Sequence, residues 1–172
     1  MSGCQVQMVD EFRLLGVTLD NKLTFTSHIT NVLSSCAQRL YLLKLLRDQG
    51  MPISCLHTIF VSLIVTKITY CISAWGGFIN ENFVGKINSL FRKAKKYGFT
   101  QTVYDYHGLR IHFDENLYHN MVFDNHCLNH LFTISRHNNT ELRDRGHSFE
   151  LPRYRTELYR SSFLPRVVYN NM

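Results

Sequence analysis

The sequence predicts a mainly α-helical protein with an N-terminal β-hairpin, a three-helix bundle and a smaller C-terminal portion that is partly helical and partly irregular. Two patterns lead to this fold class. Apolar and polar residues alternate over residues 12–19, as in a half-buried strand, whereas after Ser27 apolar residues recur every three or four positions, as on one face of a helix. Because 45% of the 172 residues are apolar and 19% are charged, the chain can bury a core, and a disordered chain is excluded.

The expected hairpin lies at the start of the chain. Residues 5–8 and 12–19 have the character of two strands, joined by a short acidic connection. Gly16 inside the second of these strands indicates a bulge or the close approach of another backbone. Asp20 and Asn21 then predict a turn that leads directly into a helix.

The first helix is expected to begin near Ser27, with Ser27 or Thr26 as its N-cap, and to end at Gly50. Its apolar residues recur at helical spacing and predict a buried stripe. That stripe consists of Ile29, Val32, Leu33, Cys36, Leu40 and Leu43.

The second helix is expected from about Ser54 to Ile72, after Pro52. Its apolar residues nearly encircle it, which predicts the central helix of the bundle: Leu56, Ile59, Phe60, Leu63, Ile64, Ile68 and Cys71. The surrounding segment is nearly long enough to cross a bilayer, but His57 and Lys67 within it favour a buried helix, since a charged side chain is costly in a membrane. No membrane partner is therefore expected.

The third helix is expected over residues 82–97, and its two faces differ in character. One face is apolar, with Phe83, Ile87, Leu90, Phe91 and Ala94, and the other is basic, with Lys86, Arg92, Lys93, Lys95 and Lys96. No acidic residue lies between Glu81 and Asp105. Such a face is usually just solvated helix surface, but its charge, with a net charge of +6 for the chain, also suits a polyanion such as a nucleic acid.

The C-terminal portion gives weaker signals. Asp114 is expected to cap a helix that runs to about Leu131, and a short helix is expected over residues 155–159 in an otherwise irregular tail. Six arginines in this tail could contact RNA phosphates, although interspersed acids favour local ion pairs. The candidates for secondary binding are Arg153, Arg155 and Arg166, within a set that also includes Arg143, Arg145 and Arg160.

Neither metal binding nor nucleophilic catalysis is indicated. His119, His126 and His130, with Cys127 beside them, would share one broad helix face, but zinc needs three or four converging ligands, so exposed or capping histidines are favoured. The five cysteines include no C-x-x-C pair, and nothing selects a Cys–His catalytic pair. No secretory signal is visible, so an intracellular protein, nuclear or cytoplasmic and not secreted, is expected.

Several motifs, in order, resemble those of one protein family. Residues 12–25, the run Ala37-Gln38-Arg39-Leu40-Tyr41-Leu42-Leu43, and the run Tyr70-Cys71-Ile72-Ser73-Ala74-Trp75-Gly76 resemble the stretch that follows the catalytic palm in non-LTR (LINE-type) retrotransposon reverse transcriptases of the jockey and chicken-repeat type. Residues 151–156 and 162–166 resemble the closing motif of the same proteins. Tyr169-Asn170 stands where relatives usually have a Trp-Asn pair.

This resemblance implies three parts: a primer-grip-like hairpin at residues 1–25, a thumb-like three-helix bundle at 26–98, and a helical, arginine-rich tail at 99–172. The family's polymerase uses adjacent aspartates that hold Mg²⁺, and this sequence has neither Asp-Asp nor Asp-x-Asp, so it is not expected to be an enzyme on its own or to hold a cofactor.

The implied function is non-catalytic binding of the backbone of RNA or an RNA–DNA hybrid through the basic third helix. The alternative is a structural or interaction protein, including a decayed transposon remnant, that self-associates through the exposed surface that would face the palm.

Overall fold

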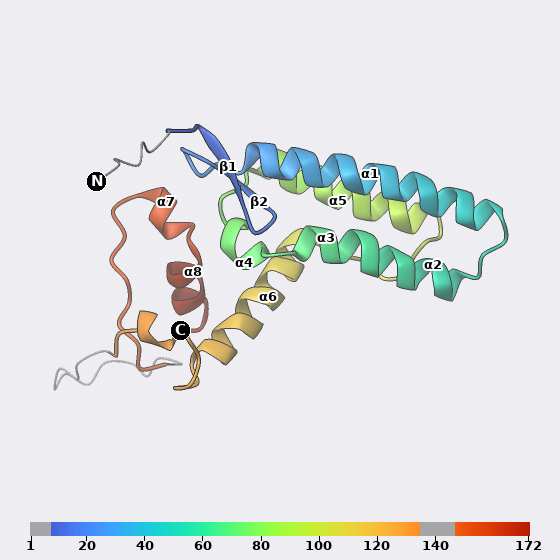
Figure 1. The fold of residues 1–172 in the computed structure, drawn as a ribbon. Coiled ribbons are helices and arrows are strands. Elements are labelled where there is room, and N and C mark those ends of the chain that lie inside the picture. Colours follow the sequence, from blue (N-terminus) through green and yellow to red (C-terminus); the bar gives the residue numbers. More distant parts are fainter. Residues whose placement is uncertain (1–7, 135–146) are drawn as a thin grey trace, which may run out of the picture. The chain divides into compact units, whose positions relative to one another are not determined.

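The computed structural model describes residues 8–134 and 147–172, and their packing groups them into two units (Figure 1). The first unit combines the described residues up to Lys67 with Ile79–Gln101, and the second combines Ile68–Phe78 with the described residues from Thr102 onward. The predicted fold class is confirmed: the protein is mainly helical and has a two-stranded antiparallel hairpin at its N-terminal side. The three-part division at residues 25 and 98 stays a prediction.

The hairpin consists of β1 (Glu11–Leu14) and β2 (Val17–Asp20), paired so that Phe12 lies opposite Leu19. Leu15 and Gly16 connect them with φ angles of 47° and 88°. Positive φ at both central residues is the requirement of a type I′ hairpin turn. The interpretation of residues 12–19 as one strand with a bulge was therefore wrong, because Gly16 turns the chain. The strand predicted at residues 5–8 lies outside the described residues except for its last residue.

A single carboxylate organises the connection from the hairpin to the first helix. Asp20 accepts hydrogen bonds from the backbone N–H groups of Lys22 (3.0 Å), Thr24 (3.1 Å) and Phe25 (2.8 Å), and from the Thr24 hydroxyl (3.0 Å). Desolvation raises the pKa of Asp20, but these hydrogen bonds outweigh it and lower the pKa below its ordinary value. The predicted turn after Asp20 is thus confirmed.

The first helix, α1 (Thr26–Asp48), follows this turn, but it is not capped as predicted. Phe25 occupies the N-cap position with φ 54°, and no side chain caps the helix. The Ser27 hydroxyl, predicted as a cap, instead donates to Glu11 of β1. The predicted apolar stripe is buried apart from the half-buried Leu33, and His28 is buried beside it. Gly50, with φ 85°, ends the helix as predicted.

The segment predicted as one regular helix is divided. It comprises α2 (Ile53–Phe60), a π-helical turn η1 (Val61–Val65) and α3 (Thr66–Thr69), followed by α4 (Ile72–Trp75), which belongs to the second unit. The apolar side chains do not encircle it, because Leu63 and Cys71 are exposed. In the first unit the buried side chains of this segment are Leu56, Phe60 and Ile64, which form one row, and Val65 beside them. This row repeats every four residues, which exceeds the 3.6 residues of an α-helical turn, and the wider π-turn keeps it on one side.

One helical segment of the described residues, Ile53–Trp75, is long enough and apolar enough to cross a membrane, with a mean hydropathy of 1.7. Core helices of soluble proteins often have the same length and hydropathy.

Of the cysteines described, Cys36 is buried, while Cys55, Cys71 and Cys127 are exposed. Burial raises the pKa of the Cys36 thiol to about 11, so this thiol stays protonated and packs as an apolar group.

In the second unit, α4 packs against α6 (Tyr106–Met121), and α6 packs against α8 (Phe163–Asn170). Asp105 caps α6 by accepting the Gly108 N–H at 3.0 Å. The predicted N-cap at Asp114 and the predicted end near Leu131 were therefore both wrong, and residues 129–131 form only the 3₁₀ turn η2 (Asn129–Leu131). The short helix α7 (Glu157–Arg160) lies where one was expected. Helix α8 was not predicted, because Pro165 by itself indicates a loop. In the structure Pro165 lies in the first turn of the helix, where proline is tolerated.

Candidate nucleic-acid interface

The third predicted helix is present as α5 (Glu81–Lys96), and its sequence explains its limits. Asn80 caps it by accepting the Phe83 N–H at 3.1 Å, Glu81 lies in the first turn, and three lysines lie in the last turn. Negative charge at the start and positive charge at the end both suit the helix dipole. The buried face packs against α1 and comprises Val84, Ile87, Leu90, Phe91 and Ala94. Phe83, predicted on this face, is half-buried, and Val84 takes its place.

The opposite face of α5 carries the predicted cations, all of which are exposed. We call these five side chains the basic cluster: Lys86, Arg92, Lys93, Lys95 and Lys96. No carboxylate within residues 8–134 and 147–172 forms an ion pair with any of them. Their charge is therefore not neutralised by that part of the chain, which leaves it available to an external anion.

Helical spacing orders the basic cluster along the helix. Lys86 and Lys93 are seven residues apart, two turns and about 10.5 Å along the axis, so they share one flank. Arg92 and Lys96, four residues apart, share the neighbouring flank. Gly85 lies on the same flank as Arg92, two turns before it, and a Cβ placed there would have no atom within 4 Å. The outer surface of α5 is thus open and positively charged, and the opposite face of the helix packs against α1.

The end of α5 is held by a residue of α1. Arg47 Nη1 donates to the Tyr97 carbonyl oxygen at 2.8 Å, and its guanidinium lies 5.8 Å from the centre of the Phe99 ring. Arg47 also pairs with Asp48 at 2.9 Å. Gly98, with φ 76°, turns the chain so that Phe99 is fully buried. These contacts fix the direction of the last turn of α5, where three of the five cations lie.

The three arginines proposed as secondary binding residues differ from one another. Arg153 and Arg155 are exposed, and phosphate binding by them stays a prediction. Arg153 also lines a shallow surface pocket of about 290 Å³ together with Glu150, Tyr159 and several apolar residues.

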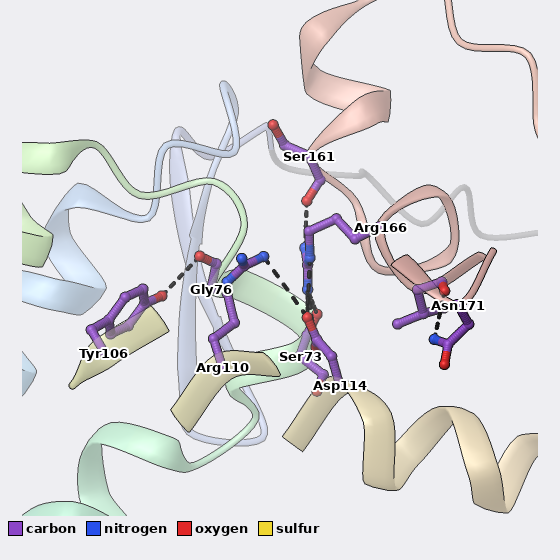
Figure 2. Close-up of polar contacts among 9 residues, drawn as sticks. Ser73, Gly76, Tyr106, Arg110, Asp114, Ser161, Arg166 and Asn171 are labelled. Atoms are coloured by element: carbon purple, nitrogen blue, oxygen red, sulfur yellow. Dashed lines mark hydrogen bonds and ion pairs between the residues drawn. The ribbon is translucent and has the colours of Figure 1, made fainter. Parts of the chain in front are cut away.

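Arg166, by contrast, lies inside the second unit with its guanidinium against Asp114 (Figure 2). Only 9% of its side chain is exposed. Its Nη2 lies 3.1 Å and 3.0 Å from the two carboxylate oxygens of Asp114, and Nε lies 3.2 Å from the second. Its Nη2 and Nη1 also donate to the Ser73 (3.0 Å) and Ser161 carbonyls. Burial lowers the pKa of Arg166, and the charge and hydrogen bonds of Asp114 offset this only in part. Arg166 therefore lies in the interior and pairs with Asp114. It is not placed to make the phosphate contact that was predicted for it.

The surroundings of this ion pair explain the two glycines after Trp75. The Tyr106 hydroxyl donates to the Gly76 carbonyl at 2.8 Å, and the ring of Tyr106 lies 6.4 Å from that of Trp75. At Gly77, a Cβ would lie 2.1 Å from Arg166 Nη1 and from the Ser161 carbonyl oxygen, so no larger residue fits without displacement. The run ending in Gly76 and the motif that contains Arg166, two parts of the resemblance noted in the sequence, therefore meet at one buried site.

The histidines considered for zinc do not share a helix. His119 is in α6, whereas His126 accepts the Leu128 N–H at 3.2 Å in a turn and His130 Nδ1 lies 2.8 Å from the Cys127 carbonyl oxygen. Within the described part of the chain, no group of three or more His, Cys, Asp or Glu side chains is placed to hold a metal ion.

Comparisons with known proteins relate the chain to a polymerase. No family model matches it, and no solved structure matches it significantly. Over 120 residues it is 28% identical to a protein of Drosophila melanogaster described as a probable RNA-directed DNA polymerase from transposon BS. The alignment covers 69% of this chain and 13% of the fly protein, so the chain spans a small part of its relative's length. The chain is thus related to part of a transposon RNA-directed DNA polymerase.

Proposed function

We propose that this chain corresponds to the region that follows the catalytic palm in a non-LTR retrotransposon reverse transcriptase, and that it binds the backbone of RNA or an RNA–DNA hybrid. The observation that supports this most is the basic cluster of α5: five exposed cations, unpaired with acids in the described residues, on a helix whose other face is buried. The relation to a transposon polymerase supplies the reason to choose a nucleic acid among polyanions.

The proposed binding is electrostatic and independent of base sequence. Lysine and arginine side chains neutralise phosphates and release condensed counterions, so affinity falls as salt rises. Because α5 is packed on α1 and its end is held by Arg47, the cations would meet the backbone without prior ordering of the helix. In this proposal the chemistry of polymerisation, with aspartates and Mg²⁺, is supplied by residues outside this sequence, and this chain binds the nucleic-acid backbone.

The test is a titration of labelled RNA–DNA hybrid, followed by fluorescence anisotropy between about 50 and 200 mM salt. The variant Lys86→Gln with Lys93→Gln removes two charges from one flank of α5. If both side chains contact phosphates, the salt slope falls by up to about 1.8 for a duplex.

A charge-matched control separates local contact from net charge. Lys22→Gln with Lys44→Gln also removes two exposed positive charges, from the hairpin connection and from α1. Its salt slope should stay close to that of the unmodified protein. Equal slopes for the two double variants, or no binding by the unmodified protein, would contradict the proposal.

A second candidate function is self-association, and the exposed hairpin favours it. Phe12 is 51% and Leu15 81% exposed, and all four residues of β1 are exposed. Among the described residues, β1 pairs only with β2, which leaves its other edge without a strand. If two copies paired antiparallel about Phe12, Glu11 of each would lie opposite Arg13 of the other, and opposite charges across strands are favourable.

This candidate is tested by sedimentation over a range of protein concentrations without nucleic acid. Phe12→Thr with Leu14→Thr keeps strand propensity but removes the apolar surface, so it should abolish concentration-dependent association. Leu45→Thr, which changes an exposed residue of α1, is the control. A protein that stays monomeric at every concentration excludes this candidate.

A further inference from the structure

An exposed aromatic side chain continues the line of cations on α5. Tyr97 follows Lys96 directly, is 41% exposed, and still donates its N–H to the Lys93 carbonyl at 2.9 Å, so it keeps helical geometry. It lies four residues after Lys93 and eleven after Lys86, spacings that return to the same side of a helix. One flank of α5 therefore presents two lysines followed by a ring.

The backbone on both sides of this ring is fixed. The Tyr97 carbonyl accepts a hydrogen bond from Arg47, and Gly98 at φ 76° turns the chain into the fully buried Phe99. The rings of Tyr97 and Phe99 are 5.8 Å apart and tilted by 56°, so Phe99 supports the Tyr97 ring from within the unit. The exposed part of Tyr97 is thus held in place before any ligand arrives, which lowers the entropic cost of binding.

The combination of a fixed, exposed ring and neighbouring cations suits one ligand chemistry. Proteins that bind single-stranded nucleic acids place the backbone on positive side chains and stack bases on aromatic rings. A base inside a duplex is already stacked on both faces, so a base must be unpaired or at the end of the duplex to offer a free face. Earlier on α5, Lys86 Nζ lies 5.1 Å from the centre of the Phe83 ring.

We propose that Tyr97 is a stacking platform for an unpaired nucleobase of the strand whose phosphates lie along Lys86 and Lys93. This inference rests on the function proposed above and adds a preference for a junction between paired and unpaired nucleic acid. The basic cluster holds the backbone, and Tyr97 binds the first base that has left the duplex.

The experiment uses the whole chain and an RNA–DNA hybrid with a short single-stranded overhang. In one series each overhang nucleotide in turn is made abasic, which keeps the phosphate but removes the base. The unmodified protein should bind the intact overhang at least about fivefold more tightly than the abasic overhang at one position, the lower end of what stacking contributes. The change Tyr97→Leu should remove this preference and leave the salt slope unchanged, whereas Tyr97→Phe should keep the preference.

A matched control and the remaining outcomes complete the test. Tyr41→Leu makes the same chemical change at an exposed tyrosine of α1 and should keep the preference for the base. If the unmodified protein binds intact and abasic overhangs equally, the stacking platform is excluded and backbone binding by the basic cluster stands. Equal weakening of both complexes by Tyr97→Leu also excludes the platform, since it indicates a structural effect. A protein that binds no hybrid excludes this inference together with the proposed function.

Discussion

The basic cluster of α5 and Arg166 carry the same sign of charge in opposite surroundings. The five cations of the first unit are exposed and lack acidic partners in the described residues, whereas Arg166 of the second unit is buried against Asp114. Both were predicted from the sequence to contact phosphates. The comparison shows that a cation becomes available to an external anion only when its own fold offers neither burial nor a carboxylate.

The buried Asp114–Arg166 pair and the basic cluster also differ in how much they contribute to the stability of the fold. Surface cations contribute little to stability, because water and salt screen them. A buried guanidinium whose partner is removed keeps its charge without compensation. Substitutions in the second unit should therefore change stability, and those in the basic cluster should change binding.

The largest effect is expected for Asp114→Asn, which removes the charge that faces Arg166 while preserving the size of the side chain. Its cost should be about 3–5 kcal/mol of unfolding free energy, because an unpaired cation remains buried. Chemical denaturation monitored at Trp75, a residue of the same unit, measures it. Replacing both partners, with Asp114→Leu and Arg166→Met, should recover much of the loss, since it removes the buried guanidinium with its acid and leaves only Arg110, whose side chain is 17% exposed. If Asp114→Asn unfolds at the same denaturant concentration as the unmodified protein, the pair contributes nothing.

The change Gly77→Ala tests how tightly the surroundings of Arg166 are packed. A Cβ at this position would lie 2.1 Å from Arg166 Nη1 and from the Ser161 carbonyl oxygen, so one of them must move. We expect a loss of about 1–3 kcal/mol, typical of overpacking. The loss should become smaller in a background that carries Arg166→Met, and a cost independent of residue 166 would show that the carbonyl alone opposes the Cβ.

A third environment, a buried polar side chain whose pKa is lowered by burial and by nearby cations, is found at His28 in the first unit. Burial lowers the pKa of His28, and the charges of Lys67 and Arg13 lower it further. The folded protein keeps the imidazole neutral where the unfolded chain takes up a proton, so stability is unaffected above the ordinary pKa of 6.5 and falls as pH drops below it. The slope should reach at most about 1.4 kcal/mol per pH unit for one proton. Denaturation at several pH values should give a smaller slope in a His28→Gln variant.

The smallest effect is expected on the open face of α5. Gly85 is helical and exposed, and a Cβ there meets no atom within 4 Å. Gly85→Ala should therefore stabilise the protein by roughly 0.5–1 kcal/mol, since alanine loses less backbone entropy on folding. Gly98→Ala is the control, because its φ of 76° is unfavourable for alanine and the same substitution should destabilise there. A destabilising Gly85→Ala would mean that this face is less open than the structure shows.

The sequence predicted best those features that depend on short-range periodicity. The buried stripe of α1 and the exposure of the basic cluster on α5 follow from spacings of three and four residues, which the structure reproduces. The chain direction at Gly16 was misread because a two-residue turn between two short strands gives almost the same alternation as one long strand. The end of α2 was misread because a π-turn has no signature in composition.

The errors at the candidate site come from contacts between distant residues. Asp114 resembles an N-cap locally, and its closest ion-pair partner, Arg166, is 52 positions away, although Arg110, one turn earlier in α6, also lies 3.9 Å from it. Local acids suggested that tail arginines would pair on the surface, but nothing nearby marked Arg166 as the buried one. Tyr97 was not singled out, although an aromatic residue next to Lys95 and Lys96 was a signal that could have been used.

The hydrogen bond from Arg166 to the Ser73 carbonyl joins positions separated by 93 residues, and this has a consequence for the order of synthesis. On a ribosome, every residue of the first unit has been made once Gln101 has been added. The second unit begins earlier, at Ile68, yet until residue 166 is translated Asp114 has only the guanidinium of Arg110, 3.9 Å away in the same helix, and lacks its closer partner. A nascent chain halted before that point would hold α6 with a buried carboxylate that lacks its closest cation, so premature termination should yield a product whose first unit is folded and whose second unit is not.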